Sequence, residues 1–170
     1  TKVGVKTRMA KFSTQPVHPD YMKLRTALLA SINSAKFGMV RNGGTRAHQG
    51  IDIKLENGYR CYAVEDATVV NVNTVNNNGY GLTVTLKLDK LNDGKQLYVF
   101  YAHLSDIRVK VGDKVEAGHV IGLSGCTGNA KGMNTIEKGS HLHFEVRTVA
   151  SAGVGLAGRL NPLDYVTLVD

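Results

Sequence analysis

The sequence has no apolar run close to the ~20 residues that a membrane-spanning helix requires. It has only 3 prolines, and its 42% hydrophobic and 21% charged residues are ordinary for a soluble globular protein. Internal repeats and low-complexity linkers are also absent. A chain of 170 residues can bury a core as one domain, or as one domain with an added segment, without disulfide or metal staples. The sequence therefore predicts a soluble protein with no membrane span.

Cysteine is scarce, and this scarcity argues against a zinc ribbon. The 2 cysteines, Cys61 and Cys126, lie far apart and form no CxxC pair. A disulfide in an oxidising compartment is one reading, and two independent buried thiols are at least as good a reading. The pair therefore says little about location.

The start of the chain lacks an initiator methionine, the apolar core of a signal peptide, and any acidic residue before Asp20. We expect a processed or excised portion, from which targeting information and a further domain or a delivery partner are missing. The same stretch carries Lys2, Lys6, Arg8 and Lys11, and the formal net charge is +7. This charge favours acidic partners such as nucleic acid, anionic lipid or a cell-wall polymer, although a merely solvated basic face explains it equally well.

One helix is predicted near the N-terminus. Its apolar residues recur with the spacing of a helix that buries one face: Tyr21, Leu24, Leu28, Leu29 and Ile32. Pro19 suits the first turn of such a helix and Gly38 suits its end.

From about residue 50 the hydrophobic period becomes two, which predicts strands. Alternating segments cover residues 66–75, 80–89, 95–104 and 141–148, and the turn-forming stretches NNNG, LNDGK and SGCTGNAKG separate them. The glycine-rich stretch VKVGDKVEAGHVIGLSG favours a tight hairpin. The expected fold is mainly β, an antiparallel sheet with a compact barrel-like core and one N-terminal helix.

The segment HLHFEV places two histidines on one face of a strand. His141, His143 and Glu145 share that face, while the alternating apolar residues between them face the core. Side chains at i and i+2 are close enough to converge on one ion. Taken alone, the pattern indicates a metal site and two ordinary surface histidines equally well.

A second segment, HQGIDI, repeats this arrangement. His48, Gly50 and Asp52 share one strand face, opposite Ile51 and Ile53. The absence of a side chain at Gly50 predicts room for a metal or a substrate backbone. A histidine and a carboxylate suit zinc, although this spacing is common by chance.

A third segment, YAHLS, ends an apolar strand with His103, which alone is more often structural or exposed. Together, the three segments contain four of the 6 histidines, whereas His18 and His119 lie in turn-like contexts and are expected to be solvated. Three protein ligands with one open position are typical of catalytic zinc, whereas structural zinc generally includes cysteine. Neither cysteine neighbours these segments, so a catalytic site is favoured.

These segments, with VKVGDKVEAGHVIGLSG between them, resemble in order and spacing the lysostaphin-type (LytM-like) zinc endopeptidases of bacterial peptidoglycan. The resemblance runs from about Phe37 to Tyr165. It implies a lysostaphin-like zinc peptidase domain over residues 37–170. The basic arm and predicted helix, residues 1–36, fall outside the resemblance.

The resemblance also implies a role for each site residue. His48, Asp52 and His143 would bind one zinc ion, and His103 and His141 would be the catalytic residues beside it. Spacing alone does not show which of His141 and His143 binds the metal, because both could reach one ion. The resemblance assigns that role to His143. Glu145 takes its expected role from its position on the same strand face: it would either orient an imidazole or, as we expect, form a surface salt bridge.

The function implied by the resemblance is zinc-dependent hydrolysis of peptide cross-links in peptidoglycan. The partners would be peptide stems and cross-links, and the location would be periplasmic, at the cell surface or secreted, including export into a competitor. A nucleic-acid-binding β domain, which the charge suggests, is disfavoured because the exposed strand faces show no aromatic-basic alternation of the stacking type. A non-catalytic wall-binding or hydrolase-activating module of the same fold is the alternative. The stretch AKGMNTIEKGS, residues 130–140, is longer than the family pattern, so the family's substrate preference is not carried over. We expect this loop to reshape one wall of the substrate groove.

Overall fold

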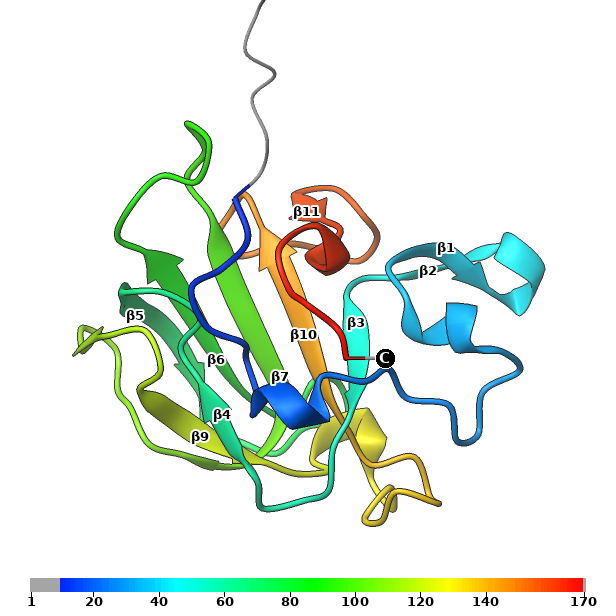
Figure 1. Cartoon of the computed structure of the whole chain (residues 1–170). Helices are drawn as coiled ribbons and strands as arrows, with labels where there is room; N and C mark the ends of the chain where they lie inside the picture. The colour runs from blue at the N-terminus through cyan, green and yellow to red at the C-terminus, as the bar shows by residue number, and fades with distance from the viewer. Residues whose placement is uncertain (1–9, 170) are drawn as a thin grey trace, which may run out of the picture.

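The computed structural model describes residues 10–169, which are mainly β (Figure 1). The strands are short: β1 Gly38–Arg41, β2 Arg46–His48, β3 Ile51–Lys54, β4 Arg60–Tyr62, β5 Ala67–Asn73, β6 Leu82–Leu88, β7 Tyr98–Ile107, β8 Lys114–Val115, β9 Val120–Ser124, β10 His141–Arg147 and β11 Arg159–Leu160. Single 3-10 turns connect some of them: η1 Pro19–Tyr21, η2 Ile32–Ala35, η3 Asn42–Gly44, η4 Gly128–Ala130 and η5 Pro162–Asp164.

Nine strands form one antiparallel sheet, whose main path runs β11-β10-β7-β6-β5-β8. Strand β3 pairs with β10, and β4 pairs with β9, which in turn pairs with β7. Strands β1 and β2 form a separate ribbon that projects beside β3 (Figure 1). The mainly antiparallel class is confirmed.

The predicted barrel-like closure is wrong. Within residues 10–169 the main path ends at β8 and β11, two strands of two residues each, and neither pairs with the other. Closure into a barrel needs continuous pairing around the sheet. Here β3, β4 and β9 pair off the main path instead, so the sheet branches and stays open.

The alternation along β10 is confirmed on its core face and departs from expectation on the other face. Leu142, Phe144 and Val146 are fully buried in the hydrophobic core. The polar residues of the strand are buried too, since all seven residues of β10 are buried. The expected exposed face of this strand is therefore covered.

The predicted N-terminal helix is wrong. Residues 10–169 contain no α-helix, and the region expected to be helical holds only η1 and η2. Leu24 instead forms an antiparallel bridge with Ile53, next to the fully buried Met22. Leu28 is 70% exposed and has a φ of 63°. Backbone hydrogen bonding to the free edge of β3 therefore prevails over the local helical periodicity.

The segment that precedes η1 lies across one face of the sheet (Figure 1). The rings of Phe12 and Tyr165 stack with centroids 5.2 Å apart, and Val17 is fully buried. Lys11 donates to the backbone carbonyl of Val166 at 2.9 Å. Three residues of the predicted basic arm, Lys2, Lys6 and Arg8, lie outside the described residues. Within residues 10–169, no helix has the length and apolar character needed to cross a membrane.

Candidate metal centre

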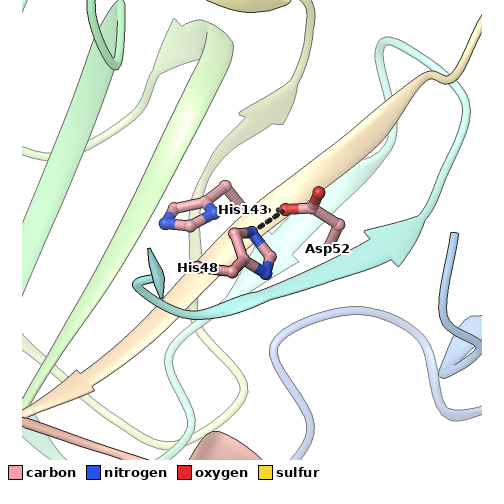
Figure 2. A group of neighbouring side chains, drawn as sticks. All are labelled: His48, Asp52 and His143. Atoms are coloured by element: carbon pink, nitrogen blue, oxygen red, sulfur yellow. Dashed lines mark hydrogen bonds and ion pairs between the residues drawn. The ribbon is translucent and has the colours of Figure 1, made fainter. Parts of the chain in front are cut away.

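Three potential ligands meet where β2, β3 and β10 come together. His48 ends β2, Asp52 lies in β3, and His143 lies directly opposite Asp52 in β10 (Figure 2). Oδ1 of Asp52 is 3.0 Å from Nε2 of His48 and 3.1 Å from Nδ1 of His143. One ligand atom from each residue lies within 4.8 Å of the other two. All three side chains are buried.

Gly50, between β2 and β3, allows this segment to approach β10 closely. A Cβ atom at this position would collide with the carbonyl oxygen of Phe144 and lie 2.8 Å from Cγ of Glu145. The space predicted for a metal or substrate is therefore taken by β10. The glycine serves the site indirectly, because it brings the β2–β3 segment close to His143.

The nitrogen of each imidazole that faces away from Asp52 has an acceptor of its own. Nδ1 of His48 lies 2.9 Å from the carbonyl oxygen of Lys36, and Nε2 of His143 lies 2.7 Å from Oε2 of Glu145. A proton on each of these outer nitrogens leaves Nε2 of His48 and Nδ1 of His143 as lone-pair donors toward Asp52. Three lone-pair atoms at this separation need a cation or a proton between them.

The electrostatics of the cluster favour positive charge. Burial opposes protonation of His143, but its hydrogen bonds to Asp52 and Glu145 outweigh burial and raise its pKa to about 9. Burial likewise opposes the charge on Asp52, yet the neighbouring imidazoles of His141, His143 and His48 hold its pKa well below the usual range. A divalent cation in place of the proton would satisfy the same groups.

His103 and His141 lie beside this cluster. Their ring centroids are 5.3 Å apart, and the His103 ring is 6.1 Å from that of His143. Nδ1 of His103 lies 2.8 Å from the carbonyl oxygen of Thr127, and Nδ1 of His141 lies 2.7 Å from that of Gly139. Burial lowers the pKa of both, that of His103 to about 3, with repulsion from the other histidines adding to the effect at His103. Both imidazoles are therefore neutral at pH 7.

His103 also has an unusual backbone. Its φ is 59°, in the left-handed region that non-glycine residues rarely adopt. It lies where β7 stops pairing with β10 and begins pairing with β9, and its N–H donates to the carbonyl of Tyr80 at 2.8 Å. Such conformations cluster at functional sites, where the surrounding structure holds them.

Glu145 is the centre of a buried ionic network, so the expected surface salt bridge is wrong. The residue is fully buried. Its Oε1 accepts from Nε of Arg147 at 2.8 Å and from Nε of Arg159 at 2.7 Å. Its Oε2 contacts His143 and accepts from the hydroxyl of Tyr80 at 3.0 Å. These charges outweigh burial and lower its pKa to about 2.

Tyr80 is a site residue that the sequence did not single out. Its ring stacks on His143 at a centroid distance of 5.4 Å, and burial together with the charge of Glu145 raises its pKa to about 12. It also lines a groove of about 490 Å³ whose other lining residues include Phe100 and Arg147. Nothing in the alternation of its segment, YGLTVTLKLD, distinguishes this tyrosine from a turn residue.

Two arginines that the sequence did not single out reach the second oxygen of Asp52. Nη2 of Arg41 lies 2.9 Å from Oδ2, and Nη1 of Arg25 lies 3.5 Å from it. Arg25 falls in the wrongly predicted helix, where it carried no signal. Arg41 falls in a short strand that the periodicity did not identify.

The remaining features singled out in the sequence are two histidines, two cysteines and one loop. His18 and His119 are exposed, as expected. Both cysteines are free: Cys61 is buried and Cys126 is partly buried. The loop over residues 130–140 is mostly exposed and ends at Ser140, directly before His141. Its residues do not line the groove beside Tyr80, and its effect on substrate binding stays a prediction.

The fold and the cluster define a mainly β protein with a buried His-Asp-His site of the kind that holds a divalent metal. A family model described as "Peptidase family M23" matches residues 46–155, and the chain belongs to this family. The predicted lysostaphin-type resemblance is confirmed.

Among curated relatives, the chain is 37% identical over 107 residues to glycyl-glycine endopeptidase ALE-1 of Staphylococcus capitis, covering 63% of this chain and 26% of that protein. It is 34% identical over 99 residues to the peptidoglycan DD-endopeptidase ShyA of Vibrio cholerae, covering 58% of this chain and 20% of that protein. The match therefore spans about a quarter or less of these relatives.

Among solved structures, the catalytic domain of the antimicrobial peptidase lysostaphin from Staphylococcus simulans matches with a TM-score of 0.56 and 31% identity. That match covers 75% of this chain and 83% of the lysostaphin domain. It supports a lysostaphin-like fold for the sheet described above.

Proposed function

We propose that this chain is a zinc-dependent endopeptidase that hydrolyses peptide cross-links of bacterial peptidoglycan. The observation that carries the proposal is the convergence of His48, Asp52 and His143 in a member of peptidase family M23. The names of two relatives, a glycyl-glycine endopeptidase and a peptidoglycan DD-endopeptidase, support the class of substrate. These names specify different bonds, so the proposal concerns peptide stems and cross-links as a class.

Nε2 of His48, Oδ1 of Asp52 and Nδ1 of His143 would hold one Zn²⁺ ion. Two neutral imidazoles and one carboxylate are a donor set that zinc accepts, and three protein ligands leave a coordination position open. When bound, zinc supplies a Lewis acid that activates water and polarises the scissile carbonyl. The contacts of Lys36 and Glu145 with the outer nitrogens of the histidines suit this role, because they fix the ring orientations.

His103 and His141 would be the catalytic residues. Each imidazole is neutral at pH 7, and each has Nδ1 held by a backbone carbonyl, so Nε2 can accept a proton. Nε2 of His141 lies 3.7 Å from Oδ1 of Asp52, close to the proposed ligands. One of these histidines would take the proton of the attacking water, and the protonated imidazole would stabilise developing negative charge or protonate the leaving amine.

The groove beside Tyr80 would receive the peptide. Polar side chains of β5 and β6 line it: Asn71, Asn73, Thr83 and Thr85. Amide and hydroxyl groups of this kind can bond the backbone of an extended peptide. Tyr80 connects the groove to the metal centre, because it lines the groove and stacks on His143.

The proposed peptidase domain spans residues 37–170, and its substrate implies a location in the periplasm, at the cell surface or outside the cell. The alternative function, a non-catalytic wall-binding or hydrolase-activating module, is less well supported. All five proposed positions carry a residue able to perform the proposed role. A module that only binds the wall has no need of two neutral imidazoles beside a metal centre.

Zymography on purified peptidoglycan, with and without a chelator, tests the proposal. We expect clearing that the chelator abolishes and that zinc restores. His48→Ala and His143→Ala should lose both zinc and hydrolysis, whereas His103→Ala and His141→Ala should keep zinc and lose turnover. His119→Ala is the matched control, because His119 is an exposed histidine away from the site. Full zinc occupancy after removal of His143 would refute the ligand assignment.

A further inference from the structure

Asp52 divides its two oxygens between different partners. Oδ1 faces His48 and His143, while Oδ2 faces two arginines, Arg41 at 2.9 Å and Arg25 at 3.5 Å. We propose that Arg25 is a positioning residue of the metal centre, whose guanidinium holds Oδ2 of Asp52 so that Oδ1 is presented to the ion. This inference rests on the proposed zinc site.

The position of Arg25 is set by backbone pairing. The N–H of Arg25 donates to the carbonyl of Asp52 at 2.9 Å, and the N–H of Lys54 donates to the carbonyl of Lys23 at 2.8 Å. These bonds add residues 23–25 to the free edge of β3, with Leu24 opposite Ile53. Because neighbouring residues of a strand face opposite sides, Leu24 enters the core while Arg25 lies on the side of Asp52.

The guanidinium is buried and fixed from several sides. Arg25 is only 5% exposed, and its Nε donates to the carbonyl of Ala27 at 3.1 Å. It packs against Gly139, whose φ is 90° and where a Cβ would lie 2.9 Å from Nη2 of Arg25. The carbonyl of Gly139 in turn contacts Nδ1 of His141. Arg25 therefore lies between the proposed ligand carboxylate and the peptide that orients His141.

Arg25 also lies in a segment that precedes the matched region, residues 46–155. The cost of burying a guanidinium is compensated only by charged and hydrogen-bonding partners. Its one charged partner among the described residues is Asp52. The segment before β1 thus contributes a charge to the metal centre as well as apolar residues to the core.

Zinc affinity of the folded protein, measured by competition with a chromophoric chelator, tests this role. Loss of a group that holds a metal ligand typically weakens metal binding about 10- to 100-fold. We expect Arg25→Gln to raise the zinc Kd by about 10-fold or more, and Arg25→Lys, which keeps the charge but not the fork, to give an intermediate Kd. Lys23→Gln is the matched control, since Lys23 is exposed on the same edge segment and should leave the Kd unchanged.

The outcomes separate this inference from the proposed function. If the wild-type chain binds no stoichiometric zinc, the proposed function fails. If the wild type binds zinc and both Arg25 variants, folded by circular dichroism, bind it with the wild-type Kd, the inference is overturned. If Arg25→Gln does not fold, Arg25→Lys decides alone: weaker zinc binding supports the role, and unchanged binding refutes it. In the cobalt-substituted protein, an altered d–d absorption spectrum of Arg25→Lys would support a shifted carboxylate.

Discussion

Replacing Glu145 by glutamine should both destabilise the fold and weaken the metal centre. The carboxylate is fully buried and accepts from two guanidinium groups, those of Arg147 and Arg159, at 2.8 and 2.7 Å. Glutamine keeps the shape but removes the charge, which leaves both cations buried without their shared anion. Breaking a buried ion pair costs about 3–5 kcal/mol, and we expect a loss near the lower end because one oxygen remains.

The same substitution should be visible in two assays. For a chain of this size, each 1 kcal/mol lost from the free energy of unfolding lowers the Tm by about 2–4 °C. A loss of ~3 kcal/mol therefore lowers the Tm of the metal-free protein by roughly 6–12 °C. The zinc Kd should rise about 10- to 100-fold, because Nε2 of His143 loses its anionic acceptor. Glu116→Gln is the control, since Glu116 is exposed. A Glu145→Gln protein with the wild-type Tm and the wild-type zinc Kd would show that the Glu145 charge supports neither the fold nor the metal centre.

Three further predictions concern the strand contact, the thiols and the metal. Gly50→Ala should lower the free energy of unfolding in urea by about 1–3 kcal/mol, because the added methyl group meets a backbone carbonyl of β10. Gly153→Ala is the control, since the space around Gly153 is open, and its stability should stay within about 0.5 kcal/mol of the wild type. Equal stabilities of the two variants would contradict the close approach of Gly50 to β10. Iodoacetamide should modify Cys126 but not Cys61 in the native protein, because Cys61 is buried and burial raises its pKa to about 12. Peptide mass spectrometry would measure the labelling, and equal labelling of the two cysteines would contradict this prediction. Zinc at about 100 times its Kd should stabilise the wild-type chain by roughly 2.7 kcal/mol, measured as a rise in Tm in a thermal melt. Asp52→Asn should lose this stabilisation. An equal zinc-induced rise in the Tm of the variant would exclude Asp52 as a ligand.

The strand pattern predicted much of the site because the period of two is local. In β10 it correctly assigned Leu142 and Phe144 to the core and His141 and His143 to the other face. It did not predict that this other face is buried, because the covering segments come from distant parts of the chain. The surface role expected for Glu145 failed for the same reason, since Arg159 approaches it from β11.

The N-terminal segment shows where local periodicity fails. The apolar spacing around Leu24 fits a helix, but β3 offers a free edge whose hydrogen bonds fix residues 23–25 in extended form. Sequence periodicity carries no information about such an edge. Arg25 could not be predicted as a site residue, because its contact with Asp52 depends entirely on this pairing.

The proposed function depends on one zinc ion that binds between His48, Asp52 and His143. Anomalous diffraction from crystals of the zinc-loaded protein, collected on both sides of the zinc absorption edge, tests it most directly. We expect a single strong zinc peak within bonding distance of Nε2 of His48, Oδ1 of Asp52 and Nδ1 of His143, about 2.0–2.2 Å from each. No peak at these three atoms, or a peak held by other residues, would contradict it.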